Sequence, residues 1–173
     1  MVKFVLYDDD RHRIPCFELN VAFITWIAEE MRARHKIDAE SMMGQTVQEY
    51  VETVFDTFAA LKPPQGILYI LEVDDEVAGM GAVKPLEEGV GEIKRMYIRP
   101  KYRGKGFGKA MLQRLIQKAK TLGYTTLRLE TGDYSTTAHH IYRSAGVKDI
   151  EEYTHLETPE WYRHNCLFME TTL

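Results

Sequence analysis

Apolar residues along the chain follow two spacings, which predict the order of helices and strands. They recur every three or four positions in a segment after Pro15 and again in residues 47–61, as in helices buried along one face. The second segment opens with Thr46-Val47-Gln48-Glu49, which fits a capping box, and Pro63-Pro64 ends it. The pattern therefore predicts two helices within residues 17–61.

Short apolar or alternating segments predict seven strands. They cover residues 2–6, 67–73, 77–83, 91–98, 125–130, 147–153 and 165–170. Two further helices are predicted, one ending near residue 122 before Gly123 and one ending before Gly146. The resulting order, β-α-α-β-β-β-α-β-α-β-β, predicts a mixed sheet of the α/β or α+β class.

Length and composition favour one domain covering residues 1–173, because 173 residues with 45% hydrophobic content can bury one core. No stretch approaches the roughly 20 apolar residues that span a bilayer, so we expect no membrane partner and a cytoplasmic location. Cys16 and Cys166 lack CxxC spacing, and the six histidines form no HxxxH pair. We therefore expect no metal.

Positive charge is concentrated in one part of an acidic chain. The net charge of −4 argues against a general nucleic-acid partner. Between residues 91 and 120, however, ten cations accompany the single anion Glu92, whereas the rest of the chain holds 12 cations and 25 anions. A solvated helix face would explain part of this cluster, and a phosphate-bearing ligand would explain why it surrounds a glycine-rich turn.

That turn is Arg103-Gly104-Lys105-Gly106-Phe107-Gly108, between a predicted strand and a predicted helix. Closely spaced glycines let backbone amides approach an anion, and the following helix adds the positive end of its dipole. The spacing fits neither the GxxxxGK of a P-loop nor the GxGxxG of a dinucleotide-binding fold. A phosphate site is one reading, and a simple strand-to-helix turn is the other.

Residues 92–109 closely resemble the acetyl-CoA-binding motif of the GCN5-related N-acetyltransferase (GNAT) superfamily, with Arg103, Gly106 and Gly108 at its signature positions. Residues 135–146 resemble the second motif of the superfamily. The resemblance covers residues 67–153 well and residues 17–61 only in element order. It implies a mostly antiparallel sheet of about seven strands, flanked by about four helices, with a splayed strand pair forming the CoA cleft.

The resemblance also implies a set of residues that bind acetyl-CoA as co-substrate. Backbone groups of Met96 and Ile98 would hold the pantetheine arm, and amides of residues 103–109 the pyrophosphate. The full implied set is Met96, Tyr97, Ile98, Arg103, Gly104, Lys105, Gly106, Phe107, Gly108, Lys109, Ser135 and Tyr142. Two positions depart from the family pattern, since Ser135 stands where Asn is frequent and Val147 where Phe is usual.

Two residues receive catalytic roles by the same resemblance. Tyr142 would donate a proton to the departing thiolate, although a tyrosine on an apolar helix face also simply fills a core. Glu92 would be the general base, with Glu130 on the next strand as its rival, and either could be only a structural carboxylate. An amide of Met96 or its neighbour, at a strand bulge, would stabilise the oxyanion.

The expected reaction is transfer of an acetyl group to a primary amine of a small molecule or peptide, by direct attack in a ternary complex. A non-catalytic CoA-binding sensor and a nucleotide-binding protein are the alternatives. Residues 17–61 and 154–164 are expected on the acceptor side, and the acidic balance outside the basic segment suggests a cationic amine. A homodimer is left open.

Overall fold

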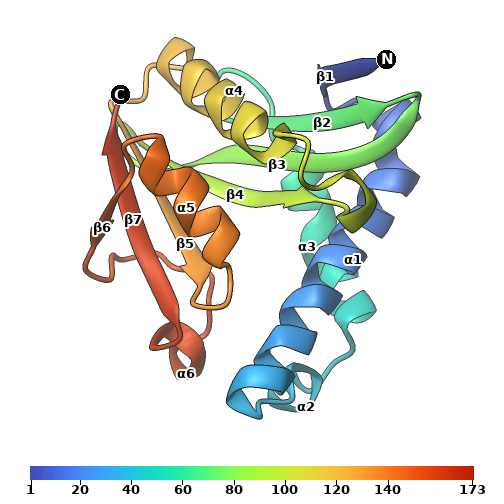
Figure 1. Cartoon of the computed structure of the whole chain (residues 1–173), viewed down its shortest axis with the longest axis vertical. Helices are drawn as coiled ribbons and strands as arrows, with labels where there is room; N and C mark the ends of the chain where they lie inside the picture. The colour runs from blue at the N-terminus through green and yellow to red at the C-terminus, as the bar shows by residue number, and fades with distance from the viewer.

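The structure, a computed structural model, describes all 173 residues around a seven-stranded sheet (Figure 1). The strands are β1 (Val2–Leu6), β2 (Ile67–Val73), β3 (Glu76–Glu87), β4 (Val90–Ile98), β5 (Thr126–Gly132), β6 (Lys148–Ile150) and β7 (Cys166–Thr172). The helices are α1 (Asp9–His35), α2 (Ala39–Met43), α3 (Val47–Ala59), α4 (Phe107–Thr121), α5 (Thr136–Ser144) and α6 (Glu160–Arg163), with the 3-10 helix Pro100–Tyr102 before α4. The predicted fold class is confirmed.

The sheet is antiparallel except at one place. Its strand order is β1-β2-β3-β4-β5-β7-β6, and only β4 and β5 run parallel. These two strands pair only from Val90↔Thr126 to Glu92↔Arg128, although both continue for several residues. Beyond these pairs they separate, as a comparison of β4 and β5 in Figure 1 shows. This is the splayed strand pair that the resemblance implies.

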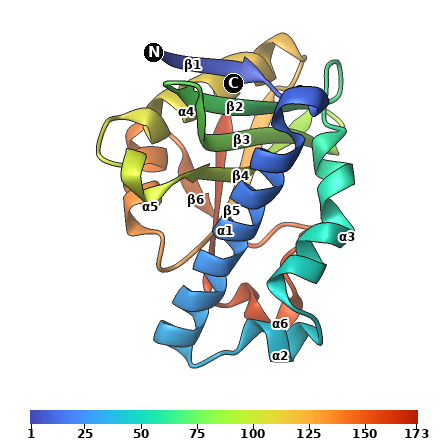
Figure 2. The same ribbon diagram turned by 90° about the vertical axis from the view of Figure 1, so that its right-hand side faces the viewer.

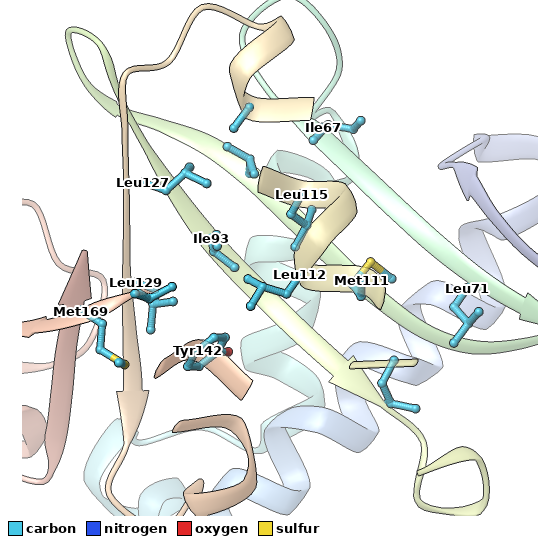
Figure 3. Packing of buried hydrophobic residues seen from close by; sticks show 14 of the residues in the cluster. Ile67, Leu71, Ile93, Met111, Leu112, Leu115, Leu127, Leu129, Tyr142 and Met169 are labelled. Carbon is cyan, nitrogen blue, oxygen red and sulfur yellow. The ribbon is translucent and has the colours of Figure 1, made fainter. Parts of the chain in front are cut away.

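Helices cover both faces of the sheet, and each face has its own core. On one face, α4 places Met111, Leu112 and Leu115 against β2, β3 and β4, as Figure 3 shows, and all three are fully buried. Burial of each such side chain contributes about 1.5–3 kcal/mol. The other face carries α1 and α3, whose apolar side chains pack on Met80 and Ala82 of β3 (Figure 2).

Helix boundaries agree with the sequence where capping signals are local. The capping box of α3 is present, with Thr46 and Glu49 each bonding the other's backbone amide. The start of α1 was predicted wrongly. It begins at Asp9, before Pro15, because the Asp8 carboxylate accepts a hydrogen bond from the Arg11 amide and caps the helix.

Three other features differ from the expected elements. β6 is limited to three residues, shorter than the predicted 147–153, while β3 continues to Glu87. The short helices α2 and α6 add to the four that the sequence predicts, and they approach each other through a small cluster that includes Ala39 and Tyr162 (Figure 2). None of the helices combines the length and the apolar character needed to cross a membrane.

Candidate active site

A cavity of about 770 Å³ opens where β4 and β5 separate. One part, which we call the loop wing, is lined by residues 103, 104 and 106–109 and by α5. The other part, the helix wing, is lined by α1, α2, Tyr50 of α3 and residues 157–162. Residues 93–98 of β4 also line the cavity. Elements that cover opposite faces of the sheet therefore line one cavity.

The glycine turn at the start of α4 is built to hold an anion. Gly104 and Gly106 have φ values of +76° and +79°, which an L side chain adopts only with strain. Gly106 is the N-cap of α4 and provides no capping side chain. None of the backbone amides from Gly104 to Lys109 donates to a backbone carbonyl. These free donors, at a helix N-terminus, match an oxygen-rich anion.

The turn is held in place from two sides. A Cβ at Gly108 would lie 3.3 Å from Cδ1 of Ile141, so its absence permits the close approach of α4 and α5. The Arg103 Nε donates to the Ile98 carbonyl at 2.9 Å, and the guanidinium carbon lies 5.4 Å from the centre of the Trp26 ring. Arg103 therefore links the turn to β4 and to α1.

A bulge interrupts β4 next to the cavity. In the register with β3, Met80 pairs with Tyr97 and Ala82 pairs with Lys94, so β4 contains one extra residue there. Arg95, within this interval, has a φ of +54°. Met96 then packs in the α4-side core, while Arg95 lies against α3 on the opposite face. The bulge that the sequence resemblance implies is present.

Tyr142 lies on α5, lines the cavity and is 6% exposed. Figure 3 shows it near Ile93 of β4 and Leu129 of β5, at the point where the two strands separate. Burial raises the pKa of its phenol. Tyr142 is therefore protonated at neutral pH and can act as a hydrogen-bond donor to a group in the cavity.

The two carboxylates named from the sequence have different surroundings. Glu92 is fully buried and does not line the cavity; its Oε1 accepts a hydrogen bond from the Tyr153 hydroxyl at 2.8 Å. Glu130 does line the cavity, and its Oε1 accepts a hydrogen bond from Lys94 Nζ at 2.6 Å. The second oxygen of Glu130 is buried without a partner in the protein.

Lys94 connects these carboxylates. Its Nζ lies 3.6 Å from Glu92 and 3.5 Å from Glu157, in addition to its bond with Glu130. Burial acts to lower the pKa of Lys94, but the three carboxylates together outweigh burial and raise the pKa. Burial also acts to raise the pKa of Glu157, which the lysines Lys94 and Lys84 nevertheless hold below its usual value. Lys94 and Glu157 are therefore both charged at neutral pH.

The structure brings most of the predicted binding residues together. Every residue of the set implied for acetyl-CoA lines the cavity except Lys105, whose Nζ lies 5.7 Å from the centre of the Tyr102 ring. Parts of both segments expected on the acceptor side, 17–61 and 154–164, line the helix wing. Sequence reasoning did not identify Lys94, Arg95 and Tyr134 as site residues, although all three line the cavity. The first two stand beside Glu92 in the basic segment, which is the signal that points to them.

Comparison with known proteins identifies the class to which this fold and cavity belong. The family model described as "Acetyltransferase (GNAT) family" matches residues 22–147 of this chain. An uncharacterized N-acetyltransferase of Schizosaccharomyces pombe is 33% identical over 119 residues, which cover 68% of this chain and 73% of that protein. The chain therefore belongs to the GNAT family. It is an acyltransferase of the GNAT N-acetyltransferase type.

Solved structures agree with this assignment. The putative acyl-CoA N-acyltransferase of Klebsiella pneumoniae superposes with a TM-score of 0.71 at 25% identity, covering 100% of this chain and 98% of that one. The PaiA N-acetyltransferase of Thermoplasma acidophilum, solved in complex with coenzyme A, has the same fold with a TM-score of 0.71. At 14% identity, and with coverage of 100% and 99%, it supports the fold alone.

Proposed function

We propose that this protein transfers an acetyl group from acetyl-CoA to a primary amine of a small molecule or peptide, by direct attack in a ternary complex. The observation that carries the proposal is the single cavity that joins the anion-binding turn to the helix wing past the β4 bulge. Two substrates entering from opposite faces of the sheet would meet there. Direct attack then requires no covalent enzyme intermediate.

Coenzyme A is the ligand of the Thermoplasma relative, and the loop wing has the donors that this ligand needs. The amides from Gly104 to Lys109 would bind the pyrophosphate, with Arg103 and Lys109 supplying positive charge. The pantetheine arm would lie along residues 96–98 of β4, in the gap where β5 offers no strand pairing. Ser135, at the start of α5, lines the same wing.

The reaction forms a bond from the amine nitrogen to the thioester carbonyl carbon and breaks the bond from that carbon to sulfur. An amide at the β4 bulge, from Met96 or its neighbour, is suited to stabilise the negative charge that develops on the carbonyl oxygen. Tyr142 would donate its proton to the departing thiolate, because burial keeps the phenol protonated, and would be reprotonated by the second proton that the attacking nitrogen loses as the amide forms. The ammonium proton of the acceptor must leave before attack.

A carboxylate is the proposed acceptor of that proton. Glu130 touches the cavity and has one oxygen without a partner, so it is suited to act directly or through one water. The prediction that Glu92 is the base stays a prediction. Because Glu92 does not line the cavity, it would act through a relay, for which the neighbouring Lys94 and Glu130 offer a route.

The proposed reaction is tested by release of free CoA thiol from acetyl-CoA in the presence of a broad pool of amines, with mass spectrometry of the products. We expect amine-dependent thiol release and a product heavier by one acetyl group. Tight binding of CoA without thiol release for any amine would contradict the proposed reaction.

Replacement of Gly106 by alanine tests the anion cradle. The change forces a side chain onto a residue with φ of +79° and should cost about 1–2 kcal/mol of stability. It should also weaken CoA binding about tenfold in titration calorimetry, because the amides move off the pyrophosphate. Gly123→Ala is the matched control: Gly123 has φ of +89° with equally open surroundings but lies at the far end of α4. If both variants bind CoA equally, the turn does not bind CoA.

Tyr142→Phe removes only the hydroxyl that would protonate the thiolate. We expect kcat to fall by about 10²-fold, while the KM for acetyl-CoA and the melting temperature stay near those of the native protein. Steady-state kinetics and a thermal melt measure both. Unchanged turnover would limit Tyr142 to a packing role.

Glu92→Gln and Glu130→Gln identify the base. The variant that lacks it should lose the acidic limb of the pH profile of kcat/KM and about 10²-fold in rate. We expect this of Glu130→Gln, because Glu130 is the carboxylate that lines the cavity. If only Glu92→Gln loses the acidic limb of the pH profile, Glu92 is the base and acts through a relay. Retention in both variants would exclude both carboxylates.

A further inference from the structure

Arg95 is a cation of the helix wing that forms no salt bridge in the protein. It lines the cavity, its Nη1 is buried without a hydrogen bond, and no carboxylate oxygen lies within 4.0 Å of its nitrogens. Its guanidinium carbon lies 5.9 Å from the centre of the Tyr50 ring and 5.7 Å from that of Phe58. These rings fix the side chain against α3.

Its neighbour Lys94, a second cation that lines this cavity, has different partners. Lys94 forms ion pairs with Glu92, Glu130 and Glu157, whereas Arg95 forms no ion pair with any of these carboxylates. One nitrogen of the Arg95 guanidinium, Nη1, is removed from water without a hydrogen bond, and stacking on aromatic rings offsets only part of the cost of burying it. The unpaired donor therefore points to an anion that the ligand itself brings.

We propose that Arg95 binds a carboxylate of the acceptor, so that the amine substrate is a carboxylate-bearing amine such as an amino acid. This inference rests on the proposed acetyl transfer to an amine. A planar guanidinium matches a carboxylate with two parallel hydrogen bonds. In the same cavity, the unpartnered oxygen of Glu130 is an acceptor suited to the ammonium group of such a molecule.

Arg95 lies away from the residues proposed to bind the CoA pyrophosphate. The bulge turns Arg95 toward α3, on the face of the sheet opposite α4 and the glycine turn. A singly charged anion also suits the surroundings, because Glu157 is close enough for Arg95 to lower the pKa of its carboxyl. This carboxylate would repel a doubly charged group at Arg95 about twice as strongly as a single carboxylate. Most other residues of the helix wing are apolar, which suits an amino acid with an apolar side chain.

The test compares three ligand series that differ only in the carboxylate: leucine, methionine and phenylalanine, their carboxamides, and the corresponding amines without the carboxyl group. Turnover with acetyl-CoA and calorimetric binding to the CoA-saturated protein are both measured. The native protein should favour the amino acids by about 30-fold or more over both analogues. In Arg95→Met, which retains an apolar stem beside Tyr50 and Phe58, this preference should disappear while CoA affinity is unchanged.

Arg95→Lys keeps the positive charge but loses the planar guanidinium that makes two parallel hydrogen bonds. It should therefore retain only part of the preference for amino acids over their analogues. Arg34→Met, which removes an exposed arginine of α1 outside the cavity, should behave like the native protein. Equal binding of acids and amides by the native protein, or an undiminished preference in Arg95→Met, would overturn the inference. The calorimetric comparison decides it even if no amine is acetylated, in which case the proposed reaction fails separately.

Discussion

The separation of β4 from β5 is the constraint on which the site depends. Parallel pairing between them ends at Glu92↔Arg128, so the strand segments beyond that pair face a gap in the middle of the sheet. Backbone donors and acceptors inside a protein need partners, and a gap between strands leaves them available to a ligand. The helices then determine what enters: α4 and α5 border the gap on one face, and α1 and α3 border it on the other (Figures 1 and 2).

The bulge in β4 determines which of the two proposed ligand sites each neighbouring side chain reaches. Side chains of a regular strand alternate between faces, and one extra residue changes this alternation. As a result, Lys94 and Arg95, which are adjacent in sequence, both line the helix wing, while Met96 joins the core under α4. The left-handed backbone of Arg95 is strained by about 1–3 kcal/mol. Its packing on Tyr50 and Phe58 helps to hold the residue in this conformation.

Local signals in the sequence predicted local structure well. The capping box at Thr46 and the turn ending in Gly106 each depend on a few adjacent residues, and the structure contains both. The sequence pattern misses the start of α1 because a proline such as Pro15 is typical of a helix boundary, whereas the cap at Asp8 outweighs one missing backbone donor. The buried carboxylate of Glu92 accepts its hydrogen bond from Tyr153, 61 positions away, so no local sequence pattern predicts this burial. Contacts at such separations are set by the strand order.

The same distinction applies to charge. In the sequence, the cations of residues 91–120 form one cluster that suggests a phosphate ligand, but the fold divides them. Arg103 and Lys109 of the glycine turn line the cavity, Lys94 forms ion pairs with three carboxylates, and Arg95 forms no salt bridge. The acidic balance of the remaining chain suggested a cationic acceptor. Arg95 forms no salt bridge and lines the same cavity as Glu130, so the ligand we propose, which carries both charges, would have a partner for each of them.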